Sequence, residues 1–329
     1  MKYNAFGATG LKVSEIGFGG SRIGGVFAGG GSSNKAALDV LGKALDSGIT
    51  FYDTADMYAQ GESEALIGTA FRGLRDQVVL ATKGGFRLPA RRNLIARIKP
   101  IVRPVVRMLG IKRARLPAGM SGALSQDFSP AYLASALEAS LKRLRTDYVD
   151  LYQLHSPGAA FMQTAAFGEA LEALEKLKAQ GKLRFYGIAT EIPEDAPFCL
   201  AAPGISSLQI GFGLLDLQAL EQGTLAAAAA RGLGIIARGC YGGGLLKDGP
   251  DEAQLKATTP KWQRILALRS FGQQTQRSVL DAALQFCRST PGVSVTLLGM
   301  RIDSHLRDSL KHLESRPLSA AEYATLSQG

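Results

Sequence analysis

Four residues whose side chains handle protons stand at or just beyond the ends of apolar runs. Asp53 ends one such run and Tyr58 lies five residues further on, while Lys83 and His155 each follow directly on a later run. Taken singly, each has an ordinary structural explanation: a turn cap, a packed phenol, a structural ion pair and a core histidine. Gathered in one small volume, they would make a poor core, because buried polar groups without partners cost free energy. Together they indicate a functional site.

The chemistry that suits these groups is proton transfer to or from an oxygen atom. A free phenol has a pKa of about 10, but a neighbouring ammonium favours the phenolate and lowers that pKa. Lys83 can supply this charge, and Asp53 can hold Lys83 protonated and oriented. His155 can hydrogen-bond a substrate oxygen and direct it. Tyr58 is then the acid when a carbonyl is reduced and the base when an alcohol is oxidised.

Eight short β-branched runs are spaced so that they could carry such a site. They are predicted as strands near residues 15–18, 50–52, 78–82, 148–154, 183–188, 206–210, 234–237 and 294–298. Longer segments of helical period alternate with them, which is typical of repeated βα units around a parallel sheet. Eight units favour a closed (β/α)8 TIM barrel, although periodicity alone leaves an open doubly wound sheet possible. In a barrel the carboxyl ends of the strands meet at one mouth, where Asp53, Lys83 and His155 would converge.

The helical segments lie near residues 34–46, 62–71, 130–143, 164–180, 217–231, 275–287 and 304–314, with a weaker one near 194–200. Ser129 before a proline is predicted to cap one helix, and Gly181 and Gly232 to end two others in the left-handed conformation. Ahead of the first unit, residues 3–6 and 11–13 flank a Gly-Ala-Thr-Gly turn and predict a β-hairpin that could plug the barrel floor. We expect residues 1–329 to form one domain, because barrels routinely reach this length.

Composition places the chain among globular proteins. It is 46% hydrophobic and 20% charged, which supplies enough apolar material for a large core. Cys199, Cys240 and Cys287 lie far apart and predict buried thiols, with neither a disulfide framework nor a zinc site; no metal is expected. No run of 18 apolar residues and no signal sequence is found, so we expect a cytoplasmic location without a membrane span.

The net charge of +10 originates in one segment. Residues 78–126 hold eleven Lys or Arg residues and no Asp or Glu. A nucleic-acid binder would spread its charge over the domain with aromatic or motif support, so no nucleic-acid partner is expected. The charge lies on a long loop predicted after the third strand, from about residue 84 to 129. This loop could gather an acidic substrate or a partner protein, touch an anionic membrane, or form a solvated lid. The basic residues that could do so are Arg91, Arg92, Arg97, Lys99, Arg103, Arg107, Lys112, Arg113 and Arg115.

In order and spacing, these motifs resemble those of the aldo-keto reductases. The matching stretches are residues 10–19, 51–58, 61–64, 81–83, 147–155 and 298–301, so the likeness covers nearly the whole chain. The resemblance implies a hydride transfer between C4 of NADPH and an aldehyde or ketone, or the reverse, without a metal. Asp53, Tyr58, Lys83 and His155 match the family's catalytic tetrad one by one.

The resemblance also implies which residues contact the nicotinamide half of the cofactor. Gly20, Ser21 and Arg22 follow the first strand, whose end contacts the cofactor in the family. The familiar glycine-rich dinucleotide fingerprint is absent, because Arg22 stands where its third glycine belongs. Gln209 matches the glutamine that binds the nicotinamide amide, and Asp53 is placed in the cofactor set as well as in the tetrad.

At the eighth strand, the resemblance implies a site for the adenosine 2′-phosphate. Arg301, His305 and Ser309 lie in the loop and the helix start where the family holds this group, which agrees with the usual phosphate site of such barrels. The Arg301 guanidinium matches phosphate geometry and favours NADP(H) over NAD(H).

Two positions depart from the family pattern. After the fifth strand most relatives have a Ser-Asn pair that contacts the carboxamide, whereas this chain has Ala189 and Thr190, of which only Thr190 can donate from its side chain. After the seventh strand, Arg238 and then Gly239 replace a common aromatic that stacks on nicotinamide. A guanidinium can stack on a ring, but its charge opposes an oxidised, positive nicotinamide. This favours the reduced cofactor or an anionic substrate group that neutralises Arg238; Tyr241 is another candidate for stacking.

Two other functions fit part of the sequence. Lys83 could form a Schiff base in an aldolase-like barrel, but Asp53 beside it would keep the amine charged and a poor nucleophile. The chain could also be a cofactor-binding regulatory subunit with weak turnover, since the family includes modules that sense nicotinamide redox state. The complete tetrad favours an NADP(H)-dependent oxidoreductase acting on a small carbonyl or alcohol. Sugars, steroids, quinones and small aldehydes all fit the sequence as substrates.

Overall fold

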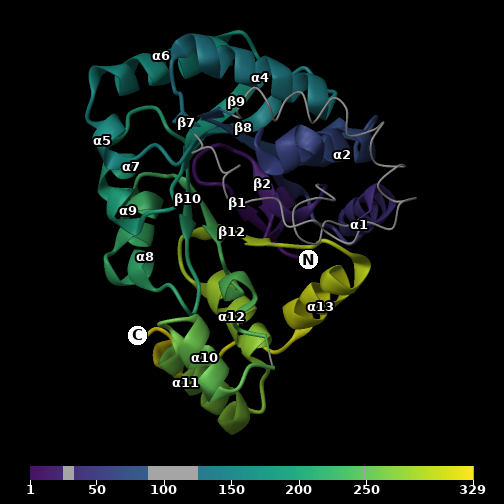
Figure 1. The fold of residues 1–329 in the computed structure, drawn as a ribbon, viewed down its shortest axis with the longest axis vertical. Helices are drawn as coiled ribbons and strands as arrows, with labels where there is room; N and C mark the ends of the chain where they lie inside the picture. The colour runs from purple at the N-terminus through teal and green to yellow at the C-terminus, as the bar shows by residue number, and fades with distance from the viewer. Residues whose placement is uncertain (25–32, 88–124, 248, 329) are drawn as a thin grey trace.

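Eight parallel strands close into a barrel (Figure 1). The structure, a computed structural model, describes residues 1–24, 33–87, 125–247 and 249–328. The barrel order is β10-β11-β12-β3-β4-β5-β8-β9, which confirms the predicted TIM barrel and excludes the open sheet. Each strand lies within two residues of its predicted place. Their bounds are β3 Ile16–Gly19, β4 Phe51–Asp53, β5 Val79–Gly84, β8 Val149–His155, β9 Leu183–Ala189, β10 Ser207–Gly211, β11 Gly234–Arg238 and β12 Val293–Leu298.

Helices surround the barrel, and α10 and α11 form a block at the lower end of the view in Figure 1. Of the helices in the described ranges, none is long and apolar enough to cross a membrane. Their bounds are α1 Asn34–Asp46, α2 Glu62–Ala70, α4 Pro130–Leu144, α5 Ala159–Met162, α6 Ala165–Ala179, α7 Ala196–Ala201, α8 Gln218–Glu221, α9 Thr224–Ala230, α10 Glu252–Thr258, α11 Trp262–Thr275, α12 Val279–Ser289, α13 Asp303–Glu314 and α14 Ala320–Leu326. Short 3-10 turns are η1 Gly20–Arg22, η2 Tyr58–Gly61, η3 Arg75–Gln77, η5 Pro193–Asp195 and η6 Gly242–Gly244.

The helix ends follow local chemistry. The Ser129 side chain accepts from the backbone N–H of Tyr132 at the start of α4, and Gly181 and Gly232 adopt φ of 75° and 68°, as predicted. The helix predicted over residues 217–231 is instead two helices, α8 and α9, because Gly223 adopts a left-handed φ of 70° between them.

The region before the last barrel strand differs from the prediction. A helix was expected near residues 275–287, but α11 ends at Thr275, where Gln276 adopts a φ of 52°. The Ser278 side chain then accepts from the Asp281 N–H and starts α12. The three cysteines are free and buried, as expected.

The N-terminal hairpin closes the barrel floor, as its sequence predicts. β1 Tyr3–Ala5 and β2 Lys12–Ser14 pair in antiparallel fashion. Phe6 and Val13 are fully buried and cluster with inward-facing barrel residues that include Phe51 and Leu151. A Cβ added at Gly234 would stand 2.6 Å from the Phe6 ring, so glycine is needed there for the plug to fit.

Hydrogen bonds join this hairpin to the late strands of the barrel. The Asn4 side chain donates to the Ser294 carbonyl at 2.9 Å, and the Ala8 N–H donates to the Gly232 carbonyl at 2.8 Å. The first residues of the chain therefore complete the floor only together with residues from its last third.

A long connection follows the third barrel strand. Strands β6 Phe86–Arg87 and β7 Ser125–Gln126 pair at its base. The basic residues from Arg91 to Arg115 lie outside the described residues.

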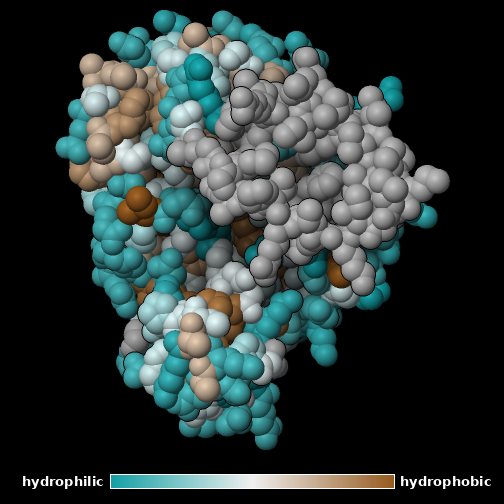
Figure 2. Space-filling model, in the orientation of Figure 1, coloured by the Kyte–Doolittle hydropathy of each residue, from teal (hydrophilic) through white to brown (hydrophobic). Residues whose placement is uncertain are grey.

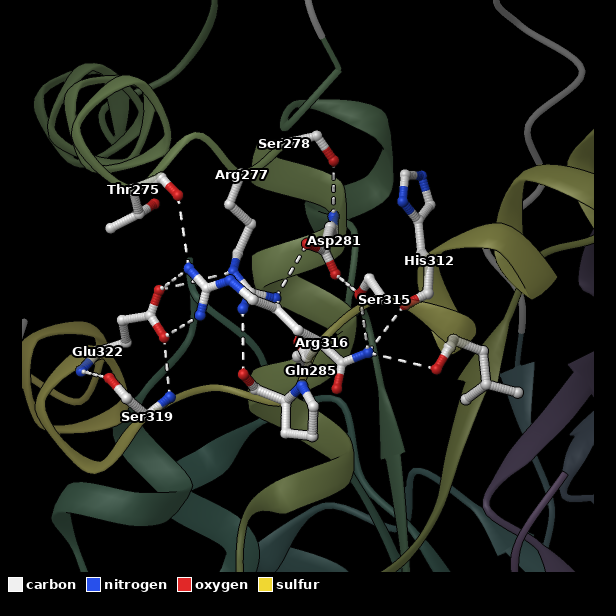
Figure 3. A network of polar contacts seen from close by, with 12 residues as sticks. Thr275, Arg277, Ser278, Asp281, Gln285, His312, Ser315, Arg316, Ser319 and Glu322 are labelled. Carbon is white, nitrogen blue, oxygen red and sulfur yellow. Dashed lines mark hydrogen bonds and ion pairs between the residues drawn. The ribbon is translucent and has the colours of Figure 1, made fainter.

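A buried arginine ties the last helices together (Figure 3). The Arg277 side chain is only 1% exposed and lies 2.9 Å from Asp281 in α12. It also donates to the carbonyls of Arg316 and Pro317 at 2.8 and 3.1 Å. Arg316 in turn pairs with Glu322 of α14 at 2.7 Å. Because Arg316 and Pro317 connect α13 to α14, the guanidinium holds both helices against α12.

Candidate active site

Three neighbouring strands bring the predicted catalytic residues together. β4, β5 and β8 are adjacent in the barrel, with Asp53 opposite Ala81 and Lys83 opposite Gln153. Asp53 and His155 are the last residues of β4 and β8, and Lys83 lies one residue before the end of β5. All three therefore lie at the carboxyl-end mouth, where such barrels carry their sites.

The segment between Asp53 and Tyr58 is fixed against β5 by its backbone. The Thr54 N–H donates to the Ala81 carbonyl at 2.9 Å, and the Asp56 N–H donates to the Lys83 carbonyl at 3.1 Å. Tyr58 begins the η2 turn directly afterwards. These bonds place the phenol beside the end of the strand that carries Lys83.

Lys83 and Asp53 form a buried ion pair. Lys83 Nζ lies 2.6 Å from each Asp53 carboxylate oxygen and 2.8 Å from the Thr54 carbonyl, so its three donors all have acceptors. Burial disfavours the ammonium, but Asp53 and Tyr58 more than offset it and raise the pKa of Lys83. A lysine held charged in this way is a poor nucleophile, which argues against the Schiff-base alternative.

Tyr58 lies within reach of the Lys83 charge. Lys83 Nζ is 5.1 Å from the centroid of the Tyr58 ring. Burial raises the pKa of Tyr58, and the Lys83 ammonium lowers it by less, so the pKa lies above its ordinary value. The predicted lowering of this pKa is therefore wrong, because burial outweighs the effect of Lys83. A protonated phenol is the form that a general acid requires.

His155 is buried and neutral. Its ring stands edge-on to Tyr58 and to Phe86, with centroid distances of 5.8 and 5.0 Å. Burial, together with the charges of Lys83 and Arg238, lowers the pKa of His155 to about 3. Its Nδ1 atom has no hydrogen-bond partner within the described part of the chain. No local sequence pattern marks Phe86, because its place beside the ring depends on the pairing of β6 with β7.

His155 is expected to stay neutral from about pH 8 to about pH 5, because its folded pKa lies far below the ordinary value of about 6.5. Its ring proton chemical shifts, measured by NMR against pH, should show no titration in that window. The unfolded chain takes up this proton near pH 6.5, so the free energy of unfolding should fall as the pH drops from about 6.5 towards 3. His155→Gln should flatten that fall. A midpoint near pH 6.5 in the folded protein would contradict the burial argument.

A cavity of about 530 Å³ extends from Asp53 and Tyr58 to helix α13, whereas Lys83 and His155 lie behind these residues and do not line it. Figure 2 shows this face of the molecule hollowed near its middle, above the block of α10 and α11. The described residues contain no group of three His, Cys, Asp or Glu arranged to hold a metal ion. The sequence-predicted residues that line the cavity are Ser21, Arg22, Asp53, Tyr58, Gln209, Arg238, Gly239, Arg301, His305 and Ser309.

Two predicted cofactor residues do not line this cavity. Gly20 is buried and its carbonyl accepts a hydrogen bond from Ser63 Oγ at 2.9 Å. The Thr190 hydroxyl turns back on its own loop, donating to the Ile192 carbonyl at 2.9 Å and accepting from the Ile192 N–H at 3.1 Å. The Thr190 carbonyl, not its hydroxyl, faces Arg238, from which it accepts a hydrogen bond.

The end of the cavity near α13 is lined by basic side chains and by glycine backbone with free space beside it. Lys247, which the sequence analysis missed, lines it together with Arg22 and Arg301. A Cβ added at Gly243 or Gly244 would meet nothing within 4 Å, so a ligand can approach that backbone. The N-terminus of α13 adds a favourable dipole for an anion. This end suits a phosphate group.

The end near the tetrad is lined by polar side chains. Gln153 Nε2 donates to Gln209 Oε1 at 2.9 Å, which fixes the orientation of the Gln209 amide. Arg238 Nη2 lies 3.0 Å from Glu191 Oε2 and 3.0 Å from the Thr190 carbonyl. Glu191 also lines the cavity and was missed in the sequence. It follows β9 and Arg238 ends β11, so their meeting spans the intervening β10 and has no local signal.

Comparisons with known proteins identify the family of this chain. The chain is 28% identical to the uncharacterized oxidoreductase YqkF of Bacillus subtilis, covering 99% of this chain and 95% of that protein. It is 28% identical to the aldo-keto reductase yakc [NADP(+)] of Schizosaccharomyces pombe, covering 77% and 67%. The solved holo form of aldo-keto reductase AKR11C1 from Bacillus halodurans superposes with a TM-score of 0.78 at 27% identity, covering 100% and 96%. The model of the Aldo/keto reductase family matches residues 15–328, so the chain belongs to this family.

Proposed function

We propose that this chain is an enzyme that transfers a hydride between NADP(H) and a small carbonyl or alcohol substrate, with Tyr58 as general acid and base. The observation that carries the proposal is the buried Lys83–Asp53 pair, with Nζ–O distances of 2.6 Å. The pair lies beside Tyr58, which lines the cavity together with Asp53 and stands edge-on to His155. Burying such a pair costs free energy because both charges lose their water. We infer that the pair is kept because it holds the Lys83 ammonium close to the Tyr58 phenol.

The cavity residues fit a nicotinamide dinucleotide phosphate. Gln209 offers a fixed amide close to the tetrad, and the far end offers Arg22, Lys247 and Arg301 beside open glycine backbone. A guanidinium pairs well with a phosphate, so Arg301 favours the phosphorylated cofactor. The relative whose name contains NADP(+) supports this choice.

Each residue of the tetrad has a separate role when a carbonyl is reduced. The bound cofactor supplies the hydride that reaches the carbonyl carbon. The Tyr58 hydroxyl donates its proton to the carbonyl oxygen, and the Lys83 ammonium stabilises the phenolate that remains. Asp53 keeps Lys83 charged and oriented, and neutral His155 hydrogen-bonds the same oxygen. In the reverse direction the phenolate accepts the alcohol proton.

NADPH is expected to bind more tightly than NADH, and Arg301→Ala should remove most of that difference. Losing a hydrogen bond to a charged group costs about 1.5–3 kcal/mol, so the Kd for NADPH should rise about tenfold or more while that for NADH changes little. Fluorescence titration of both cofactors measures this. Arg307→Ala is the matched control, because Arg307 lies on the same helix, is 70% exposed and pairs with Asp303.

The same titration decides the proposal as a whole. Failure of the wild-type protein to bind NADPH would contradict the proposed function. Equal losses for both cofactors in Arg301→Ala would contradict the phosphate role of Arg301. Binding without turnover across a panel of aldehydes, ketones and sugars would favour the regulatory alternative.

A further inference from the structure

The Arg238–Glu191 pair places two opposite charges beside the reacting groups. Both side chains line the cavity that contains Tyr58 and Asp53. Arg238 is 29% exposed and Glu191 is 61% exposed. Burial is the main cause of the raised pKa of Tyr58 and of the lowered pKa of His155; Glu191 adds to the first shift and Arg238 to the second, so both charges act at the tetrad. Hydride and proton reach the same carbonyl group, so the reacting ring must lie close to Tyr58 and to this pair.

The two forms of the cofactor differ in charge at that ring. The oxidised nicotinamide carries a positive charge that the reduced ring lacks. Arg238 alone would therefore repel the oxidised form. Glu191 Oε2, at 3.0 Å from Arg238 Nη2, compensates that cation within the protein. The protein itself thus supplies the neutralising anion, with no need for an acidic substrate.

We propose that Glu191, through its ion pair with Arg238, sets the preference of the site between the oxidised and the reduced cofactor. Glu191 is a specificity-determining residue for the oxidation state, and the inference rests on the proposed function. With Glu191 present, both forms bind; without its carboxylate, the reduced form is favoured.

The test measures binding and needs no turnover. The Kd values of NADP⁺ and NADPH are measured by calorimetry for the wild type and Glu191→Gln. The ratio of Kd for NADP⁺ to Kd for NADPH should rise about three- to fivefold in Glu191→Gln, a size that allows for the solvent exposure of the pair. This change would make the bound cofactor couple more oxidising by about 14 to 21 mV.

Two further variants separate charge from loop structure. Arg238→Gln leaves Glu191 unopposed and should lower the ratio, and the double variant should return it towards the wild-type value. Loss of the Arg238 bond to the Thr190 carbonyl would affect both cofactor forms alike and cancel in the ratio. Glu194→Gln is the matched control, because Glu194 lies on the same loop, outside the cavity lining, and accepts from Gln218 at 3.0 Å.

The outcomes separate this inference from the proposed function. Absence of binding of either cofactor to the wild type would overturn the proposed function. Binding of both forms with a ratio that Glu191→Gln leaves unchanged, or that Glu194→Gln changes equally, would overturn the role of Glu191 alone.

Discussion

Replacing Tyr58 with Phe is expected to lower kcat by about 10²- to 10⁴-fold, the usual contribution of a positioned general acid. The change deletes one hydroxyl, keeps the ring that stands edge-on to His155, and leaves the Lys83–Asp53 pair intact. The affinity for NADPH should therefore stay nearly unchanged. Cofactor absorbance in steady state and in single turnovers, with NADPH titrated separately, measures both quantities.

Tyr323→Phe is the control for this substitution. It removes the same hydroxyl from a tyrosine of α14 that contacts Thr290, far along the chain from the tetrad. It should leave kcat near the wild-type value. Equal turnover by Tyr58→Phe and wild type would rule out Tyr58 as the proton donor.

Replacing Arg277 with Met is expected to lower the free energy of unfolding by about 3–5 kcal/mol, because the buried Asp281 carboxylate would lose its cationic partner. The guanidinium is 1% exposed, and Asp281 and two backbone carbonyls depend on it (Figure 3). The carbonyls belong to the link between α13 and α14. Since α13 carries His305 and Ser309 on the cavity wall, the variant should also bind NADPH more weakly.

Urea denaturation measures the stability change, with Arg307→Met as the matched control. Arg307 also pairs with an aspartate in the same i,i+4 relation, but its side chain is 70% exposed. Surface pairs of this kind contribute about 0–1 kcal/mol. A loss in Arg277→Met no larger than in the control would show that the buried network does not stabilise the last helices.

The strands and three of the tetrad positions could be predicted because their signals are local. An apolar run ends at a polar residue, and parallel strands in a barrel bring such ends to one mouth. Asp53, Lys83 and His155 carry that signal, and the gap of five residues to Tyr58 is short enough to keep the phenol nearby. The predicted helices α1 and α4 have clear amphipathic patterns with capping serines.

What the sequence did not predict depends on neighbours that are distant in the chain. Glu191 pairs with Arg238, which lies two strands away in the barrel. Lys247 lines the cavity because the glycine turn η6 brings the chain there. Helix α11 lacks a strong apolar stripe and a capping side chain, so neither signal marks it. The pKa of Tyr58 likewise depends on how deeply tertiary packing buries the ring, which competes with the charge of Lys83.

The floor of the barrel joins residues that are synthesised early to residues that are synthesised late. The hairpin of residues 3–14 leaves the ribosome before the late strands, yet the partners of Asn4 and Ala8 are Ser294 and Gly232. A nascent chain that ends before those residues therefore carries Phe6 and Val13 without their full cover. Apolar surface exposed for that long makes a chain prone to aggregation. The barrel floor can close only after Gly232 and Ser294 have also left the ribosome.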